Sequence, residues 1–187
     1  MCALNKVKGM DLTMNLKKLK IIGTIIALVL PFLLHFLYDL IPSFITSIFL
    51  PVNESIWEHM KILFGSIILS GVIQKIIAII KKEKINNICF SNFIAAIFSI
   101  PVFLILFLPV YSIIGENMII TIIIMFITII LSEILSYKII NMNDFKLENK
   151  TIIFVIIVYI IFGILTYNPI KIDLFKDPQS NSYGIKK

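Results

Sequence analysis

Long apolar runs separated by short polar stretches dominate this sequence. A helix needs about 20 consecutive apolar residues to cross the hydrocarbon core of a bilayer. Five runs approach or exceed that length, at residues 21–40, 55–80, 92–114, 118–140 and 151–167. The pattern therefore predicts an all-α integral membrane protein that folds as a bundle of five transmembrane helices.

The connecting segments predict how these helices are joined. The links 81–91 and 141–150 are short and polar, and the link 115–117 is so short that it predicts a tight antiparallel hairpin. The link 41–54 contains Pro42 and Pro51 and carries no charge before Glu54. We expect it to lie in the membrane interface or to dip back into the bilayer.

Prolines and the N-terminal residues modify this arrangement. Pro101 and Pro109 interrupt the run 92–114 and predict a kink there. Residues 1–20 show no periodic pattern and are predicted to be a disordered cytoplasmic segment, with Met1 and Met14 as equal candidates for the start. The lysines before residue 21 resemble a signal peptide, but no small-residue cleavage motif follows, so we expect an uncleaved helix.

Lysine placement orients the predicted bundle. All 17 basic residues are lysine. Twelve fall on the side of the N-terminus and of the links 81–91 and 141–150, and five fall on the opposite side. Positive residues concentrate on the cytoplasmic side of membrane proteins. The N-terminus is therefore predicted inside, the tail 168–187 outside, and the protein in the cell membrane as a multi-pass protein.

Composition narrows the class of protein further. The chain is 59% hydrophobic, with a mean hydropathy of +1.00 and a net charge of +6. Lysines that flank apolar runs indicate contacts with lipid headgroups, so the bilayer is the expected partner and nucleic acid is not. Cys2 and Cys89 both fall on the predicted cytoplasmic side, where a disulfide framework is not expected. Lysine without arginine suggests an AT-rich bacterial genome.

The stretch PVNESIWEHMK, residues 51–61, concentrates charge within an otherwise apolar chain. His35 and Asp39 lie four residues apart, on one face of the first predicted helix near its outer end. Consecutive helices with a short link are usually neighbours. We therefore expect a polar cluster just below the outer surface, formed by His35, Asp39, Glu54, Glu58 and His59.

One interpretation of this motif is structural. Ser55 and Glu58 fit the capping box that begins a helix, with Asn53 as an alternative cap. Glu58 and Lys61 can pair at i, i+3. Trp57 then belongs to the aromatic belt at the membrane interface. In this interpretation the motif is a helix cap and anchor.

The other interpretation is chemical, because His35, His59 and Lys61 lie within the apolar limits of their helices, where ionisable groups usually mark a site. Histidine and carboxylate suit zinc or another divalent metal. The candidate metal ligands are His35, His59, Asp39 and Glu54. Glu58 is then a candidate general base, and Lys61 is a candidate stabiliser of negative charge. The spacing does not match H-E-x-x-H, and a haem between the two histidines has no further support.

Three functional classes stay open. A metal-dependent membrane enzyme predicts bound metal that is lost with His59. A transporter or ion-pathway component predicts a continuous polar path inward, through residues such as Gln74 and Glu133. A structural or accessory subunit predicts that a surface for a protein partner or a second copy matters more.

Three segments together carry a resemblance to a known family. HFLYD at 35–39, PVNESIWEHMK at 51–61 and LFKDPQSNSYGI at 174–185 resemble a family of small multi-pass bacterial membrane proteins of unknown function. The matching residues are Asn53, Glu54, Ser55, Trp57, Glu58, His59 and Lys61 in the motif, and Phe175, Asp177, Pro178, Tyr183 and Gly184 in the tail. The resemblance implies no activity. Because both motifs fall on the predicted outer side, we expect the tail to fold over the cluster, with Asp177 or Tyr183 adding polar groups.

Overall fold

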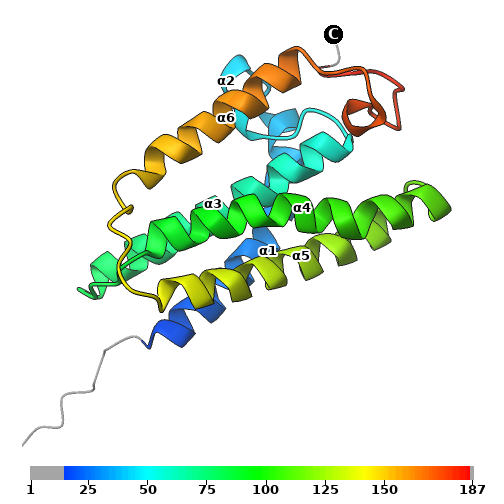
Figure 1. The fold of residues 1–187 in the computed structure, drawn as a ribbon. Coiled ribbons are helices and arrows are strands. Elements are labelled where there is room, and N and C mark those ends of the chain that lie inside the picture. The colour runs from blue at the N-terminus through cyan, green and yellow to red at the C-terminus, as the bar shows by residue number, and fades with distance from the viewer. Residues whose placement is uncertain (1–14, 186–187) are drawn as a thin grey trace, which may run out of the picture.

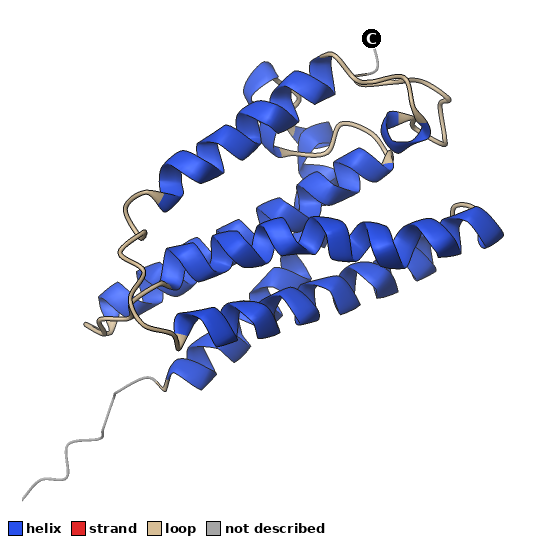
Figure 2. Ribbon diagram, in the orientation of Figure 1, coloured by secondary structure: helices blue, strands red, loops and turns tan. Residues whose placement is uncertain are grey.

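The computed structural model describes residues 15–185, and these form six α-helices and one short 3-10 helix (Figure 1). The helices are α1 (Leu16–Leu40), α2 (Phe44–Phe49), α3 (Ile56–Ile80), α4 (Ile88–Ile114), α5 (Met118–Ile140), α6 (Thr151–Tyr167) and the 3-10 helix η1 (Asp173–Phe175). Over these residues there is no sheet, only an isolated bridge between Lys176 and Tyr183 (Figure 2). The prediction of an all-α protein is confirmed.

Of the described helices, α1, α3, α4 and α5 are each long and apolar enough to cross a membrane. Helix α6 is also apolar but has 17 residues, so it is about 25 Å long. The four long helices pack together, with α4 against α3 and α5, and with α1 against the same two helices. Helix α6 lies on the other side of α3 and α4, beside α2 (Figure 1).

Helix α1 begins earlier than the apolar pattern indicated. The side chain of Asn15 accepts a hydrogen bond from the backbone N–H of Lys17 at 2.9 Å and so caps the helix before Leu16. The prediction of disorder is therefore wrong for residues 16–20, which form the first turns of α1; residues 1–14 lie outside the described residues. Lysine is a good helix former, so the polar stretch continues the helix beyond its apolar part.

Helix α2 was not expected, because six residues between two prolines give no periodic signal. Its N-terminus is closed by a complete capping box, in which Ser43 and Thr46 each bond to the backbone N–H of the other. The link 41–54 therefore folds back as a short helix that packs against α6.

Helix α4 begins at Ile88, ahead of the predicted residue 92. Asn87 precedes it in a left-handed conformation (φ 60°), and its side chain donates to the carbonyls of Met142 and Asn143. The carboxylate of Glu148 accepts hydrogen bonds from the first backbone N–H groups of the helix, at Cys89 and Phe90. A residue from the far link thus caps the helix, and α4 then continues as one helix through both of its prolines.

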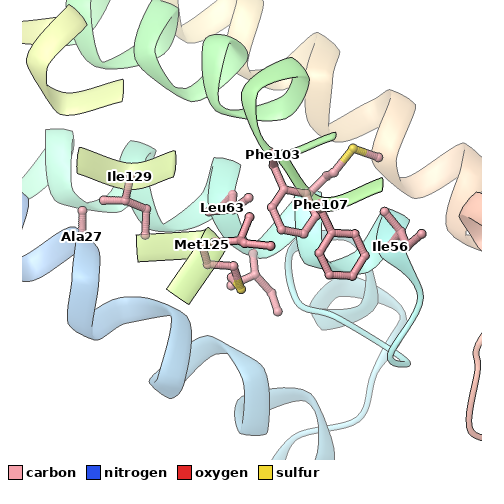
Figure 3. Close-up of a cluster of buried hydrophobic side chains, with 10 residues drawn as sticks. Ala27, Ile56, Leu63, Phe103, Phe107, Met125 and Ile129 are labelled. Atoms are coloured by element: carbon pink, nitrogen blue, oxygen red, sulfur yellow. The ribbon is translucent and has the colours of Figure 1, made fainter. Parts of the chain in front are cut away.

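The core lies where α1, α3, α4 and α5 meet (Figure 3). This core includes Phe103 and Phe107 of α4, Leu63 of α3, and Met125 and Ile129 of α5. Small residues let the backbones approach closely, as expected in membrane helix packing. A Cβ atom added at Gly71 would lie 2.7 Å from the Cβ of Asn92 on α4. The Nε2 of Gln74 on α3 also lies 3.5 Å from the Oδ1 of Asn92, so Gln74 forms a polar contact between the two helices.

Candidate functional site

The residues of the 51–61 motif lie at one end of the helix bundle. There the C-terminal end of α1, the segment 50–55, the first turns of α3 and the tail after η1 come together (Figure 1). Ser55 is the N-cap of α3, and its hydroxyl accepts the N–H of Glu58 at 3.4 Å, which confirms the predicted cap. Asn53 instead accepts the N–H of Ser55 at 2.9 Å. In a complete capping box the side chain of Glu58 would accept the N–H of Ser55. Here the side chain of Asn53 accepts that N–H in its place.

The carboxylate of Glu58 turns inward and pairs with Lys61. The two charged groups lie 2.6 Å apart and both side chains are buried, which confirms the predicted i, i+3 pair. Glu58 also accepts hydrogen bonds from the N–H of Val52 and from the hydroxyl of Thr166, both at 3.2 Å. This carboxylate thus has three partners in the protein, from α3, from the segment before it and from α6.

The side chain of Lys61 is equally enclosed. It donates to the backbone carbonyls of Ser47 and Leu50, at 2.9 and 3.2 Å, and to the hydroxyl of Thr166 at 2.9 Å. Ser47 belongs to α2, Leu50 to the segment that follows it, and Thr166 to α6. The pair thus links α2, α3 and α6, and a catalytic role for Glu58 or Lys61 stays an untested prediction.

A second polar group is formed by His35, Glu54 and His59. The Nε2 of His35 lies 3.2 Å from one oxygen of Glu54, and the Nε2 of His59 lies 3.8 Å from the other. All three side chains are partly exposed, between 14% and 28%. The hydrogen bond with His35 lowers the pKa of Glu54, although partial burial acts in the opposite direction.

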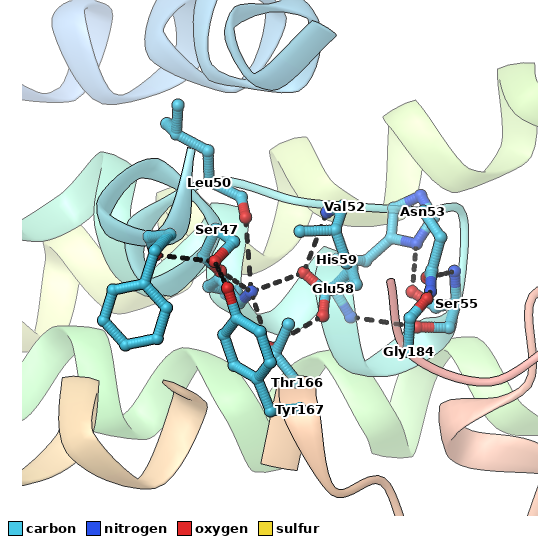
Figure 4. Close-up of polar contacts among 12 residues, drawn as sticks. Ser47, Leu50, Val52, Asn53, Ser55, Glu58, His59, Thr166, Tyr167 and Gly184 are labelled. Atoms are coloured by element: carbon cyan, nitrogen blue, oxygen red, sulfur yellow. Dashed lines mark hydrogen bonds and ion pairs between the residues drawn. The ribbon is translucent and has the colours of Figure 1, made fainter. Parts of the chain in front are cut away.

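The ring of His59 is oriented by its own helix. Its Nδ1 lies 2.9 Å from the backbone carbonyl of Ser55 (Figure 4). A carbonyl can only accept, so Nδ1 carries the hydrogen and, in the neutral ring, Nε2 is an acceptor. The ring of His59 also stacks on the ring of Phe103, with ring centroids 6.4 Å apart. This geometry directs an acceptor nitrogen toward Glu54.

A cavity of about 330 Å³ is lined at one end by His35, Glu54 and His59. Its apolar wall comes mainly from α1, α4 and α5: Pro31, Phe32, Phe36, Phe107, Tyr111, Met118, Ile122, Met125 and Phe126. Its polar lining is His35, Glu54, His59, Glu116, Thr121, Lys176 and Gln179. Pockets that bind small molecules have this character, mostly apolar with a few placed polar groups, and begin at about 300 Å³.

The tail folds back onto this end of the bundle. Phe175 packs on Trp57 with ring centroids 4.8 Å apart, and the side chain of Asn53 donates to the carbonyl of Gly184 at 2.8 Å. Lys176 and Gln179 line the cavity. Trp57 thus packs between the tail and α6, and its place in an aromatic belt at the membrane interface stays a prediction.

Of the two tail residues predicted to add polar groups to the cluster, Asp177 lies close enough to Glu54 for its charge to act to raise the pKa of that carboxyl. Asp177 is fully buried, and its side chain accepts hydrogen bonds from the N–H of Gln179 and the hydroxyl of Ser180. Tyr183 pairs with Lys176 in the isolated bridge. Both shape the tail itself, and neither lines the cavity.

The predicted metal ligands come together only in part. His35, Glu54 and His59 converge, whereas Asp39 is exposed and does not line the cavity. Over residues 15–185, no group of three or more His, Cys, Asp or Glu side chains is arranged to hold a metal ion. A divalent metal therefore stays a prediction, without support from the geometry.

A second buried charge pair lies toward the other end of the bundle and was missed as a pair. Lys20 of α1 lies 2.7 Å from Glu133 of α5, and its ammonium also donates to Asn92 and Ser136 at 3.1 and 2.8 Å. Lys20 is 4% exposed, so it is not one of the flanking surface lysines. The sequence suggested Glu133 only as a residue of a possible polar path, and nothing local to Lys20 reveals that the two residues are partners.

The fold and this site define an all-helical protein with several helices able to cross a membrane and a polar-ended cavity at one end of the bundle. The chain belongs to a family of unknown function, DUF6512, whose sequence profile matches residues 9–185. Comparison with curated proteins and with solved structures finds no match. The family assigns no activity, so the function must be argued from the cavity.

Proposed function

We propose that this protein is a five-span membrane protein that binds a small amphiphilic molecule at its extracytoplasmic end. The observation that carries the proposal is the cavity of about 330 Å³, in which an apolar wall ends at His35, Glu54 and His59. The apolar part of the ligand packs against α1, α4 and α5, and its polar head group meets the histidines and the carboxylate.

Helix α6 supports five spans and the proposed orientation. Its 17 residues fall at the short end of the range for a crossing helix. It begins after the link 141–150, which carries Lys146 and Lys150, and ends where the tail packs on the start of α3 (Figure 1). Its two ends therefore reach opposite ends of the bundle, and the lysine-rich end is the cytoplasmic one.

A transport function gains less support from the arrangement of the core. Between the cavity and the Lys20–Glu133 pair, each helix presents apolar residues: Ala27 on α1, Leu63 on α3 and Ile129 on α5. These residues belong to one packed cluster (Figure 3). Buried hydroxyls also lie on this stretch of α3, but Ser66 and Ser70 each donate to a backbone carbonyl. We therefore favour a binding site open at one end over a continuous polar path.

Two neighbouring residues of α5 allow a direct test of the cavity. Ile122 lines it, whereas Ile123 is 52% exposed on the outer face of the helix. With the protein in lipid nanodiscs, we expect at least one of octylamine, octanol and octanoate to raise the melting temperature of the wild type and of Ile123→Trp. The larger side chain of Ile122→Trp fills the cavity and abolishes the shift. Equal shifts in both variants, or no shift with any compound, overturn the proposal.

A further inference from the structure

We infer that the head group held at the polar end of the cavity is a primary ammonium. This inference rests on the proposed function, because it names the class of ligand for the same cavity. It starts from the two acceptors that face each other there, His59 Nε2 and Glu54 Oε2, which are 3.8 Å apart.

Neither of these atoms accepts a hydrogen bond from the described residues. The bond from Nδ1 to Ser55 makes Nε2 of the neutral His59 ring an acceptor. The other oxygen of Glu54 is already bonded to His35 at 3.2 Å. A ligand that bridges the remaining pair must therefore supply two donors from nearly one point.

The number of donors distinguishes the possible head groups. A hydroxyl has one donor and can satisfy one of the two acceptors, whereas an ammonium has three. Hydrogen bonds from an ammonium to a carboxylate are about 2.7–2.9 Å long, so one nitrogen can reach two acceptors separated by 3.8 Å. A carboxylate head group has no donor at all.

The charges around the cavity favour a cation as well. Glu54 and Glu116 both line it, and Lys176 is the only lysine among its described lining residues. Glu116 is exposed and has no ion-pair partner among residues 15–185, so its charge is not neutralised by the protein. An anionic head group meets two carboxylates there, whereas an ammonium meets complementary charge.

The aromatic lining contributes in the same direction. Phe103, Phe107 and Tyr111 form a stacked row along α4, with successive ring centroids 4.9 and 5.3 Å apart. Phe107 and Tyr111 line the cavity. The faces of aromatic rings attract cations and also pack against an alkyl chain, so this wall suits an alkylamine along its whole length.

The test compares four octyl compounds that share one tail: octylamine, octyltrimethylammonium, octanol and octanoate. Dissociation constants are measured by calorimetry in nanodiscs, with partition into empty nanodiscs subtracted. We expect octylamine to bind at least about tenfold more tightly than octanol, because its bonds to the carboxylate are charge-assisted. Octyltrimethylammonium keeps the charge but has no N–H donor, so it binds less tightly than octylamine.

Two variants connect this preference to the named carboxylates. Glu54→Gln lowers octylamine affinity about tenfold and changes octanol affinity less. Glu116→Gln, at an exposed position that leaves the fold intact, lowers octylamine affinity about twofold to fivefold. Glu83→Gln, at the other end of the bundle, serves as the control and leaves both affinities unchanged.

The outcomes distinguish the proposed binding cavity from the proposed ammonium head group. Octanol or octanoate binding as tightly as octylamine, with binding still abolished by Ile122→Trp, overturns the ammonium head group and leaves the cavity site standing. Octylamine affinity that is unchanged in both Glu54→Gln and Glu116→Gln also overturns it. Failure of all four compounds to bind overturns the binding function and the head group together.

Discussion

The Nζ of Lys61 lies 2.6 Å from the Oε2 of Glu58, and both side chains are buried. One turn away, Glu54 and His35 form a contact of 3.2 Å in which both side chains are more than a quarter exposed. The motif 51–61 therefore contains two groups of polar residues with different roles. Glu58 and Lys61 hold the helices together, whereas Glu54 and His59 face the cavity.

The first prediction concerns Lys61. Replacing it as Lys61→Met leaves the buried charge of Glu58 without its ion-pair partner and removes the donor from two backbone carbonyls. Breaking a buried pair in this way costs about 3–5 kcal/mol of unfolding free energy. The loss is measurable by denaturant titration in mixed micelles, with Lys81→Met at an exposed position as the control. The double variant Glu58→Gln/Lys61→Met should recover part of the loss; equal stability of Lys61→Met and the wild type contradicts the structural role.

The second prediction compares the two buried carboxylates. Glu58 is bonded to Lys61, Val52 and Thr166, whereas Glu133 is held by Lys20. Over the described residues, the second oxygen of Glu133 has no hydrogen-bond partner. Glu58→Gln should therefore lower the unfolding free energy more than Glu133→Gln, measured by the same titration. The reverse order shows that the Lys20–Glu133 pair, not the motif, is the main polar link of the bundle.

The third prediction is a pH dependence at the start of α4. Burial acts to raise the pKa of Glu148, but bonds from Lys75 and from the N–H of Cys89 lower it below its ordinary value. A carboxyl with a lowered pKa in the folded state stabilises the protein above its unfolded pKa, about 4.3. That stability is lost as the pH falls through the lowered folded pKa.

Melting temperatures between neutral and acidic pH check this sign. We expect Glu148→Gln to be less stable than the wild type at neutral pH, with the difference shrinking as the pH falls below about 4. Glu83→Gln, in the link 81–87 at the same end, controls for the general effect of losing a carboxylate. A difference that grows toward acidic pH contradicts the assignment.

Where a capping residue directly precedes an apolar run, the sequence predicted the limits of the helix correctly. Helix α5 occupies Met118–Ile140, the predicted range, because an apolar run follows the Asn117 cap directly. Helix α2 was missed because its six residues stand in an apolar link, where only Ser43 and Thr46 indicate a helix start. The early start of α4 depends on Glu148, which no local pattern connects to residue 88.

Only the parts of the site that are formed by residues close together in the sequence could be predicted. The Ser55 cap and the Glu58–Lys61 pair follow from spacing along one helix, and the structure confirms both. The cavity combines side chains from α1, α4, α5 and the tail, so its shape depends on packing that a sequence does not display. The Lys20–Glu133 pair was hidden for the same reason, since Lys20 stands among lysines that mark a membrane boundary.

The fourth prediction decides whether the two histidines hold a metal. One oxygen of Glu54 is already bonded to His35, and Asp39 does not line the cavity. We therefore expect protein purified without chelator to contain far less than one transition-metal ion per chain, as counted by mass spectrometry. The His35→Ala/His59→Ala variant should give the same count. One zinc ion per chain, lost in this variant, establishes a metal centre and excludes the ammonium site at the same atoms.

The last prediction concerns topology, on which the proposed extracytoplasmic position of the cavity depends. With five crossings and the lysine-rich links 81–87 and 141–150 in the cytoplasm, a reporter fused after the tail lies outside. We expect alkaline phosphatase fused at the C-terminus to be active and a fluorescent protein at the same position to be dark. A fusion of each reporter in the link 81–87 is the matched control and should show the opposite pattern. If both fusions are fluorescent, α6 does not cross and the five-span topology is wrong. If both reporters show the reverse of the expected pattern, the whole bundle is inverted, and the cavity, where the tail packs on Trp57, lies on the cytoplasmic side.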